Sequence, residues 1–109
     1  IKLLTPKQHD ILLANISHLP HALAFSLINS MPERHLGLAP NSLKDMTRIA
    51  SSDASLWVDI FLSNRNNLIK SIDSFSDSLN KLKCALGSRD RNKLKSFFCR
   101  AGRKRKIIK

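Results

Sequence analysis

The sequence predicts an all-α domain, and three observations support that prediction. Valine occurs once and tyrosine never among the 109 residues, and no segment alternates apolar and polar side chains as a half-buried strand does. Leucine, isoleucine and phenylalanine instead recur at spacings of three and four. With 42% apolar residues, the chain can form one domain with a modest core.

The first helix is predicted to begin after Thr5. Thr5 can cap this helix, Pro6 suits its first position, and Gln8 stands where a capping box places a glutamine. The helix should continue to about Ser30 with a kink at Pro20, because proline cannot donate a backbone hydrogen bond. Its apolar face comprises Leu12, Ile16, Leu19, Leu23 and Leu27.

The following segments are predicted to be shorter. Residues 31–40 are expected to form a loop, because two prolines and a glycine interrupt them. A short helix then covers roughly residues 42–50, and the Ser-Ser-Asp string at 51–53 ends it and caps the next helix.

A single long helix is predicted from Ala54 to Gly87. Its apolar residues follow a heptad-like pattern that only a polar residue at position 64 or 65 interrupts. This apolar seam consists of Phe61, Leu68, Ile72, Phe75, Leu79, Leu82 and Leu86. Gly87 should end the helix, and Ser88 should cap a final helix. The apolar face of that final helix comprises Leu94, Phe97 and Phe98.

The length of the predicted helix indicates a homodimer. A helix of about 33 residues spans about 50 Å, whereas a lone globule of this chain length is about 30 Å across. The projecting seam needs a cover, and a second copy of the chain is the simplest one. We therefore expect an intertwined homodimer.

The net charge of +11 is concentrated near the C-terminus. Residues 89–109 hold ten Lys or Arg against the single Asp90, whereas residues 1–88 are nearly balanced. We expect residues 1–99 to form the domain and residues 100–109 to form a frayed basic tail. The alternative function is a non-enzymatic helical interaction module whose basic tail binds nucleic acid. Nucleic acid is not the expected partner, because the tail lacks interleaved aromatic residues and any groove-reading motif.

The cysteines and the uncharged segment 11–32 indicate where in the cell the protein is located. Cys84 and Cys99 are the only cysteines, and neither shares a zinc-binding spacing with a histidine, so we expect no metal and a reducing, cytoplasmic location. Residues 11–32 carry no Asp, Glu, Lys or Arg, but they contain many polar side chains. We expect protein to cover this helix, and we expect no membrane span.

Arg48 and Asp45 form one candidate group of site residues. They are three residues apart on a short helix, so an ordinary surface salt bridge is one explanation. Neighbouring apolar residues instead predict a mostly buried segment, in which the guanidinium of Arg48 would need a fully paired anion. A guanidinium can hold a carboxylate ligand through two parallel hydrogen bonds.

His18, His21 and Trp57 form a second group. The two histidines share a face of the kinked first helix, where each could be a core histidine bonded to backbone or part of a polar pocket. A metal site is not favoured, because no third ligand stands at a matching spacing. Trp57 could be a core aromatic residue or the wall of a pocket.

Two strings in the sequence resemble a known family. Ser17-His18-Leu19-Pro20-His21 is similar to the first helix of the C-terminal domain of prephenate dehydrogenases. Residues 44–50, followed by Trp57-Val58-Asp59-Ile60-Phe61 and Asn64, resemble the second signature of that family in the same order. The resemblance covers most of residues 5–100 and fades in the basic tail.

The resemblance implies an enzyme of tyrosine biosynthesis. Such enzymes convert prephenate, or arogenate in some relatives, with NAD or NADP as hydride acceptor, and tyrosine inhibits some of them. It implies that Arg48 clamps a substrate carboxylate, that one or both of His18 and His21 hydrogen-bond the substrate or tyrosine, and that Asp45 and Trp57 shape the pocket. In this family the helical domain forms the dimer.

The catalytic and cofactor-binding residues are expected outside this chain. The three glycines, Gly37, Gly87 and Gly102, are scattered and form no phosphate-binding fingerprint. The chain begins at Ile1 rather than Met, which suggests a fragment. The resemblance implies a nucleotide-binding domain upstream that holds the cofactor and the catalytic residues, so we expect no activity from this chain alone.

Overall fold

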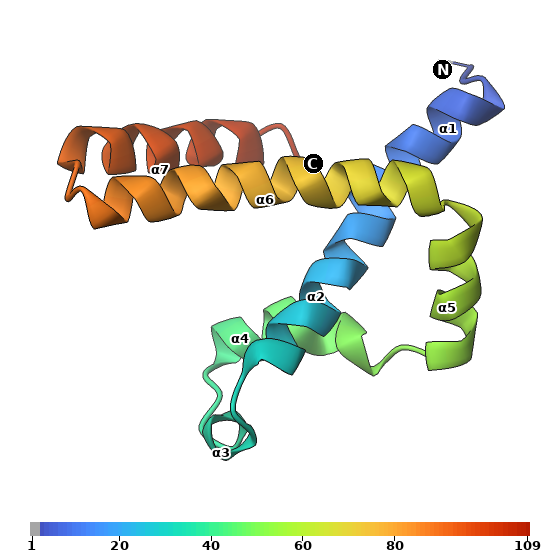
Figure 1. The fold of residues 1–109 in the computed structure, drawn as a ribbon, viewed down its shortest axis with the longest axis horizontal. Coiled ribbons are helices and arrows are strands. Elements are labelled where there is room, and N and C mark those ends of the chain that lie inside the picture. The colour runs from blue at the N-terminus through green and yellow to red at the C-terminus, as the bar shows by residue number, and fades with distance from the viewer. Residues whose placement is uncertain (1–2) are drawn as a thin grey trace. The chain divides into compact units, whose positions relative to one another are not determined.

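The computed structural model describes residues 3–109, which form helices and contain no strand, as predicted (Figure 1). The chain divides into two compact units, one ending at Ile72 and the other comprising Asp73–Lys109. The boundary falls within a helix, and each unit is described below by itself.

The first unit opens with a long helical segment in three parts. These are α1 (Pro6–Leu13), the π-helical turn η1 (Ala14–His18) and α2 (Leu19–Ser30). The predicted capping box is confirmed: the Thr5 backbone N–H donates to Gln8 Oε1 at 2.9 Å, and the Gln8 N–H donates to Thr5 Oγ1 at 3.1 Å. At the predicted kink the helix widens, so that the Leu19 N–H bonds the carbonyl of Ala14. Pro20 has no backbone N–H to donate, and a wider turn just before it accommodates the missing hydrogen bond.

The segment after α2 contains more helix than the sequence predicted. The expected loop holds the short helix α3 (Glu33–Leu36), and α4 (Asn41–Thr47) is followed by the 3-10 turn η2 (Arg48–Ser51). The prediction that this segment is mostly buried is wrong, since Arg48 is exposed and the Met46 side chain is 67% exposed. Both α4 and η2 pack against α2.

The predicted long helix is divided in two. Asp53 caps α5 (Ala54–Ser63) by accepting from the N–H groups of Ser55 and Leu56 at 3.0 and 3.3 Å. Asn64 then leaves the helical conformation (φ −122°, ψ 31°), and α6 (Arg65–Gly87) follows. The break falls at the one polar position of the apolar seam, so the heptad pattern concealed the end of a helix.

The second unit contains the rest of α6 and α7 (Arg91–Arg105). Gly87 ends α6 as predicted, but the predicted cap at Ser88 is wrong. Asp90 caps α7 by accepting from the Lys93 N–H at 3.0 Å, while the Ser88 hydroxyl donates back to the carbonyl of Cys84 at 3.1 Å. The frayed tail predicted from residue 100 is also wrong, because α7 continues through Arg105.

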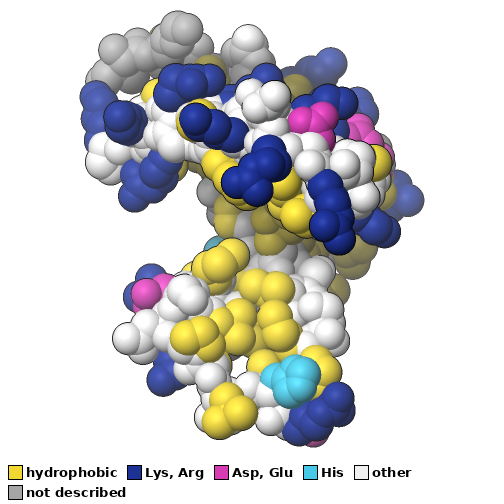
Figure 2. Space-filling view, turned by 90° about the vertical axis from the view of Figure 1, so that its left-hand side faces the viewer, with side chains coloured by type: hydrophobic (Ala, Val, Ile, Leu, Met, Phe, Trp, Pro, Cys, Tyr) yellow, Lys and Arg dark blue, Asp and Glu magenta, His cyan; other side chains and the backbone are white. Residues whose placement is uncertain are grey.

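Burial within the chain is concentrated on small residues. Ala14, Ala22 and Ala24 are buried in the first unit, and Ala85 is buried in the second. Small side chains allow helices to approach closely, whereas many large apolar side chains remain exposed. Figure 2 shows hydrophobic side chains gathered over the α2–α4 region and Lys and Arg side chains crowded over the α6–α7 hairpin. A single chain therefore leaves many large apolar side chains exposed that its own small core does not cover.

Candidate ligand site at the histidine pair

The site is centred on the two histidines of the first helical segment. His18 ends the π-helical turn and is buried, while His21 lies one turn further on and is partly buried. The Nδ1 of His21 lies 3.0 Å from the carbonyl oxygen of Ser17. A carbonyl can only accept, so His21 carries a proton on Nδ1.

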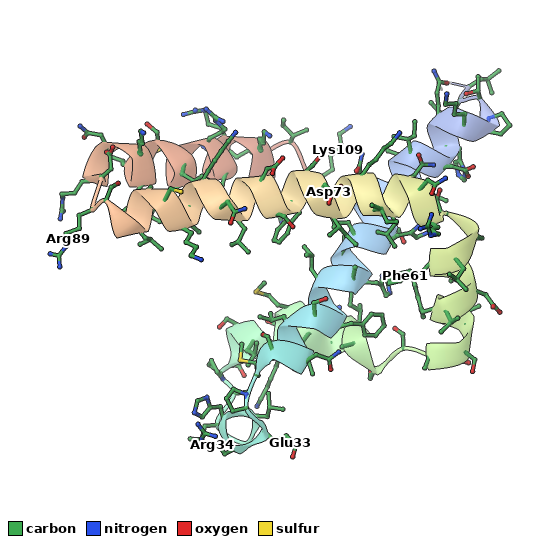
Figure 3. All side chains as sticks on the ribbon, viewed as in Figure 1. Glu33, Arg34, Phe61, Asp73, Arg89 and Lys109 are labelled. Atoms are coloured by element: carbon green, nitrogen blue, oxygen red, sulfur yellow. The ribbon has the colours of Figure 1, made fainter. Side chains whose placement is uncertain are left out.

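Trp57 closes one side of the site from α5. Its ring stacks on His21 with centroids 3.6 Å apart and planes 19° apart, and it meets His18 edge-on at 6.3 Å. Phe61 continues this contact one turn along α5: its ring lies 5.8 Å from Trp57 and 6.3 Å from Phe25 on α2. Figure 3 shows Phe61 directed from α5 toward α2. The two histidines therefore lie against an aromatic wall rather than in open solvent.

Asn64 supplies the polar side of the site. Its Nδ2 lies 2.8 Å from the backbone oxygen of Asp10 and 3.2 Å from Nδ1 of His18, and its Oδ1 accepts from Asn67 Nδ2 at 2.9 Å. Burial, and secondarily the nearby His21, lower the pKa of His18 below its usual value, while Asp10 acts in the opposite direction. His18 is therefore favoured in its neutral form.

A second polar contact ties the same helices together. The Ser71 hydroxyl donates to Asn15 Oδ1 at 2.6 Å, and Ser71 is buried. Asn64 and Ser71 thus bind the first helical segment at two points, each through a side chain that an apolar seam would not predict. Both bonds lie within the first unit.

Arg48 and Asp45 lie apart from this contact network. Both side chains are exposed, and the structure of residues 3–109 shows no ion pair between them. Arg48 opens η2, whose backbone packs against the same α2 helix that carries His21. Of the five residues predicted from the sequence, the structure brings His18 and His21 against Trp57 and leaves Arg48 and Asp45 exposed beside α2.

The sequence placed Phe61 in the apolar seam and Asn64 in a string that resembles the family, but it gave neither of them, nor Ser71, a role in the site. The available signal was the polar residue within the apolar seam, which marks a buried position that needs a partner. No sequence rule indicates that this partner is a histidine 46 positions earlier, since the pairing depends on how the helices pack.

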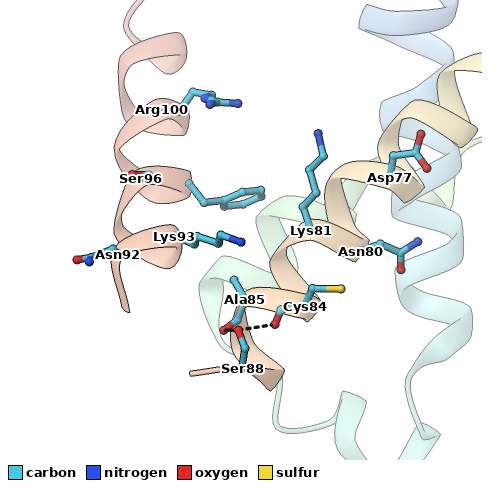
Figure 4. Close-up of a pocket in the computed structure, with 11 residues that line it drawn as sticks. Asp77, Asn80, Lys81, Cys84, Ala85, Ser88, Asn92, Lys93, Ser96 and Arg100 are labelled. Carbon is cyan, nitrogen blue, oxygen red and sulfur yellow. Dashed lines mark hydrogen bonds between the residues drawn. The ribbon is translucent and has the colours of Figure 1, made fainter. Parts of the chain in front are cut away.

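The second unit contains a groove between α6 and α7 (Figure 4). Its lining mixes polar and charged side chains, such as Asn80, Lys81 and Arg100, with Ala85 and Phe97. Among the described residues, no cluster of three His, Cys, Asp or Glu side chains could hold a metal ion. Both cysteines are free and exposed.

Fold and side-chain contacts together define an all-α domain in which two histidines lie against an aromatic wall, and comparison with known proteins identifies its family. Residues 5–100 match the family model described as "Prephenate dehydrogenase, dimerization domain". The chain therefore belongs to the prephenate dehydrogenase family, of which it is the dimerization domain.

Individual relatives agree with this assignment. The chain is 34% identical to the cyclohexadienyl dehydrogenase of Zymomonas mobilis, covering 100% of this chain and 40% of that protein. It is 30% identical to the prephenate dehydrogenase of Lactococcus lactis, covering 88% of this chain and 29% of that protein. The chain thus spans well under half the length of these relatives.

Solved structures show the same fold. Prephenate dehydrogenase from A. aeolicus, crystallised with hydroxyphenyl propionate and NAD+, matches with a TM-score of 0.88 and 38% identity, over 99% of this chain and 40% of that one. Arogenate dehydrogenase from Synechocystis matches with a TM-score of 0.90 over 100% of this chain and 42% of that one. At 23% identity, the latter likeness supports the fold alone.

Proposed function

We propose that the intact protein is an NAD(P)-dependent prephenate or arogenate dehydrogenase of tyrosine biosynthesis, in which this chain supplies dimerisation and part of the substrate site. The observation that supports this most directly is the contact of His18, His21 and Trp57, within a domain whose fold is shared with a dehydrogenase crystallised with a hydroxyphenyl ligand. An aromatic wall beside two imidazoles suits a ring that carries oxygen substituents.

The proposed role of this chain is to hold and orient the substrate. Arg48, on the turn that packs against α2, would form two parallel hydrogen bonds with a substrate carboxylate. His18 and His21 would hydrogen-bond other oxygens of the substrate or of tyrosine, and Trp57 and Asp45 would shape the pocket. Fixing the orientation of a substrate supplies part of the rate enhancement of an enzyme.

The redox step is assigned to a part of the enzyme outside this chain. In the proposed reaction the ring of prephenate gives a hydride to the nicotinamide while the ring carboxylate leaves as carbon dioxide, which yields 4-hydroxyphenylpyruvate. The described residues offer no nucleotide cradle: the glycines are scattered, and none has a positive φ. We therefore place no nucleotide contact on this chain and expect it to be inactive alone.

Exposed apolar surface on α6 supports a homodimer. Leu79 and Leu86 of the predicted seam are 52% and 58% exposed within one chain. On a helix they lie on the side away from Lys81 and Ser88, which face the α6–α7 groove. Each residue leaves about half of its surface uncovered by its own chain, so a second copy would bury the seam, in agreement with the name of the family.

The apolar first segment can be explained in the same way. Residues Pro6–Ser30 are long and apolar enough to cross a membrane by length and composition, since an 18-residue window within them has a mean hydropathy of 1.5. His18 and Asn15, however, hydrogen-bond side chains of α6 and its N-terminal flank, as expected for a helix packed in protein. We propose that protein covers this segment in the dimer and that the enzyme is cytoplasmic.

The basic helix α7 is the feature that would support the alternative function, a helical interaction module that binds nucleic acid. Its last turn carries Arg103, Lys104 and Arg105 on an ordered helix, a surface that could attract a nucleic acid. That function requires steeply salt-dependent binding of DNA or RNA that is lost when residues 100–109 are deleted.

The direct experiment measures NAD(P)H formation by the intact protein. Prephenate and arogenate are each supplied with NAD+ or NADP+, and tyrosine is added to the active pair. We expect reduction of a nicotinamide with at least one of these substrates. No reduction in any combination, together with salt-dependent nucleic-acid binding, would overturn the proposal in favour of the interaction module.

A further inference from the structure

Asn64 occupies a position that helical periodicity alone does not explain. It interrupts the helix between α5 and α6, and its side chain is 9% exposed. Burying a primary amide is unfavourable unless its hydrogen-bonding groups find partners. All of the partners present are in the first unit, and one of them is His18.

The orientation of the Asn64 amide follows from these partners. The Asp10 carbonyl oxygen lies 2.8 Å from Nδ2 of Asn64 and can only accept, so this end of the amide must be the NH₂ group. The same nitrogen lies 3.2 Å from Nδ1 of His18. Nδ1 of His18 must therefore accept, and in the neutral ring the proton is on Nε2.

The second histidine has the opposite arrangement. His21 donates from Nδ1 to the carbonyl of Ser17, so its neutral ring has an unprotonated Nε2. Two histidines three residues apart thus hold opposite tautomers, each set by a different partner. This gives the site one fixed imidazole donor and one fixed imidazole acceptor.

The Nε2 of His18 remains available to a ligand. It makes no hydrogen bond to the described residues. Every fully buried side-chain nitrogen or oxygen among those residues has a partner, so this unpaired atom must be partly accessible to solvent. The atom is therefore not sealed inside the protein. The charged and titratable groups that act on the ring are His21 on α2 and Asp10 on α1. Burial, and secondarily His21, lower the pKa of His18 and favour the neutral ring, while Asp10 acts in the opposite direction.

We propose that Asn64 is a positioning residue that fixes His18 as the tautomer protonated on Nε2, so that the site presents an N–H donor to an oxygen of the substrate. The proposal rests on the function proposed above and deepens it, since it names a residue that controls the polarity of the substrate pocket. A carboxylate, hydroxyl or keto oxygen of the substrate would accept this bond.

The first test reads the tautomers directly by ¹⁵N NMR of histidine side chains in the intact, ligand-free protein. We expect His18 to show an unprotonated Nδ1 and a protonated Nε2, and His21 to show the reverse. In Asn64→Asp the carboxylate can only accept, so His18 should acquire a proton on Nδ1 while His21 stays unchanged. A wild-type His18 protonated on Nδ1, or a spectrum unaltered by Asn64→Asp, overturns the proposal.

The matched control is Ser71→Ala. It removes the hydrogen bond that α6 makes to Asn15 of the first helical segment, and Ser71 makes no hydrogen bond to His18 in the structure. We expect its His18 spectrum to equal that of the wild type. If Asn64→Asp does not fold, Asn64→Ala serves instead, and there His18 should exchange between both tautomers.

Kinetics then connect the tautomer to the substrate. We expect Asn64→Asp to raise KM for the active substrate by about tenfold, as for the loss of one hydrogen bond of roughly 1.4 kcal/mol, and Ser71→Ala to change it less than twofold. Equal changes in the two variants would reduce Asn64 to a structural residue and overturn the proposal. If the wild type turns over neither substrate, the proposed function fails, whereas the NMR result still decides the tautomer.

Discussion

The two units of this chain use polar residues in different ways. In the first unit, His18, Asn64 and Ser71 are buried and hydrogen-bonded across helices that are distant in sequence. In the second unit the only buried residue is Ala85, and its many Lys and Arg side chains are exposed. Burying a polar group costs free energy unless its partners are built in. The first unit therefore buries polar groups together with their partners, whereas the second keeps its charged side chains in solvent.

The largest effect is expected at Arg48. In the intact enzyme, Arg48→Ala should lower kcat/KM by roughly 30- to 1,000-fold, on the order of 2–4 kcal/mol, because a substrate carboxylate would lose its charged partner. Steady-state kinetics with the active substrate measure this. Arg34→Ala, at another exposed arginine of the first unit, should leave kcat/KM within about twofold of the wild type. An unchanged kcat/KM in Arg48→Ala removes this residue from the site.

The second prediction concerns the α6 seam. Leu79→Glu would place a charge in the proposed dimer interface and should weaken dimerisation by at least about tenfold, since an unpaired charge is costly to bury. Light scattering over a dilution series measures the dissociation constant. The same substitution at Leu38, which is 84% exposed and outside α6, provides the control and should leave the dimer intact. A stable wild-type monomer at micromolar concentration contradicts the homodimer itself.

Helix caps allow the two units to be compared on equal terms. Thr5→Ala removes the capping box of α1, and Asp90→Ala removes the side-chain cap of α7. Each should reduce the free energy of unfolding by about 1 kcal/mol. Denaturant unfolding measures the loss, and hydrogen exchange locates it. We expect Thr5→Ala to increase exchange in α1 and Asp90→Ala to increase it in α7, and the same pattern in both variants would show that the caps do not act locally.

The fold was predictable wherever local chemistry determines it. The Thr5 capping box and the end of α6 at Gly87 follow from short-range rules, and both are present; the helix is also irregular just before Pro20, in the π-helical turn Ala14–His18. The sequence failed where tertiary contact decides the structure. The heptad pattern runs past Asn64 because its neighbours in the seam, Phe61 and Leu68, are apolar. The contacts of Asn64 with Asp10 and His18 join residues far apart in the sequence, which the pattern does not reveal.

The site was also predictable only in part, because local spacing determines some of its contacts and tertiary packing determines the others. Spacing placed His18 and His21 on one face, and resemblance added Trp57, which stacks on His21. Burial of the segment around Arg48 was predicted from its apolar neighbours, but Met46 and Arg48 are exposed, and Ile49 and Ala50 are only half-buried. Local composition does not distinguish a residue facing its own core from one facing solvent or a partner.

The smallest expected effect is the pH dependence that His18 gives to stability. Its pKa is lower in the folded protein than in the unfolded chain, chiefly through burial, so the unfolded state binds the proton more readily. The free energy of unfolding should therefore be fully retained above the unfolded pKa of about 6.5 and should fall as pH decreases from there toward the lower folded value. His18→Gln keeps an acceptor for Asn64 and has no titrating ring, so subtracting its pH profile from that of the wild type isolates the contribution of His18. No difference between the two profiles below pH 6.5 would mean that His18 is as readily protonated in the folded protein as in the unfolded chain, and the contrast between the two units would then rest on hydrogen bonding alone.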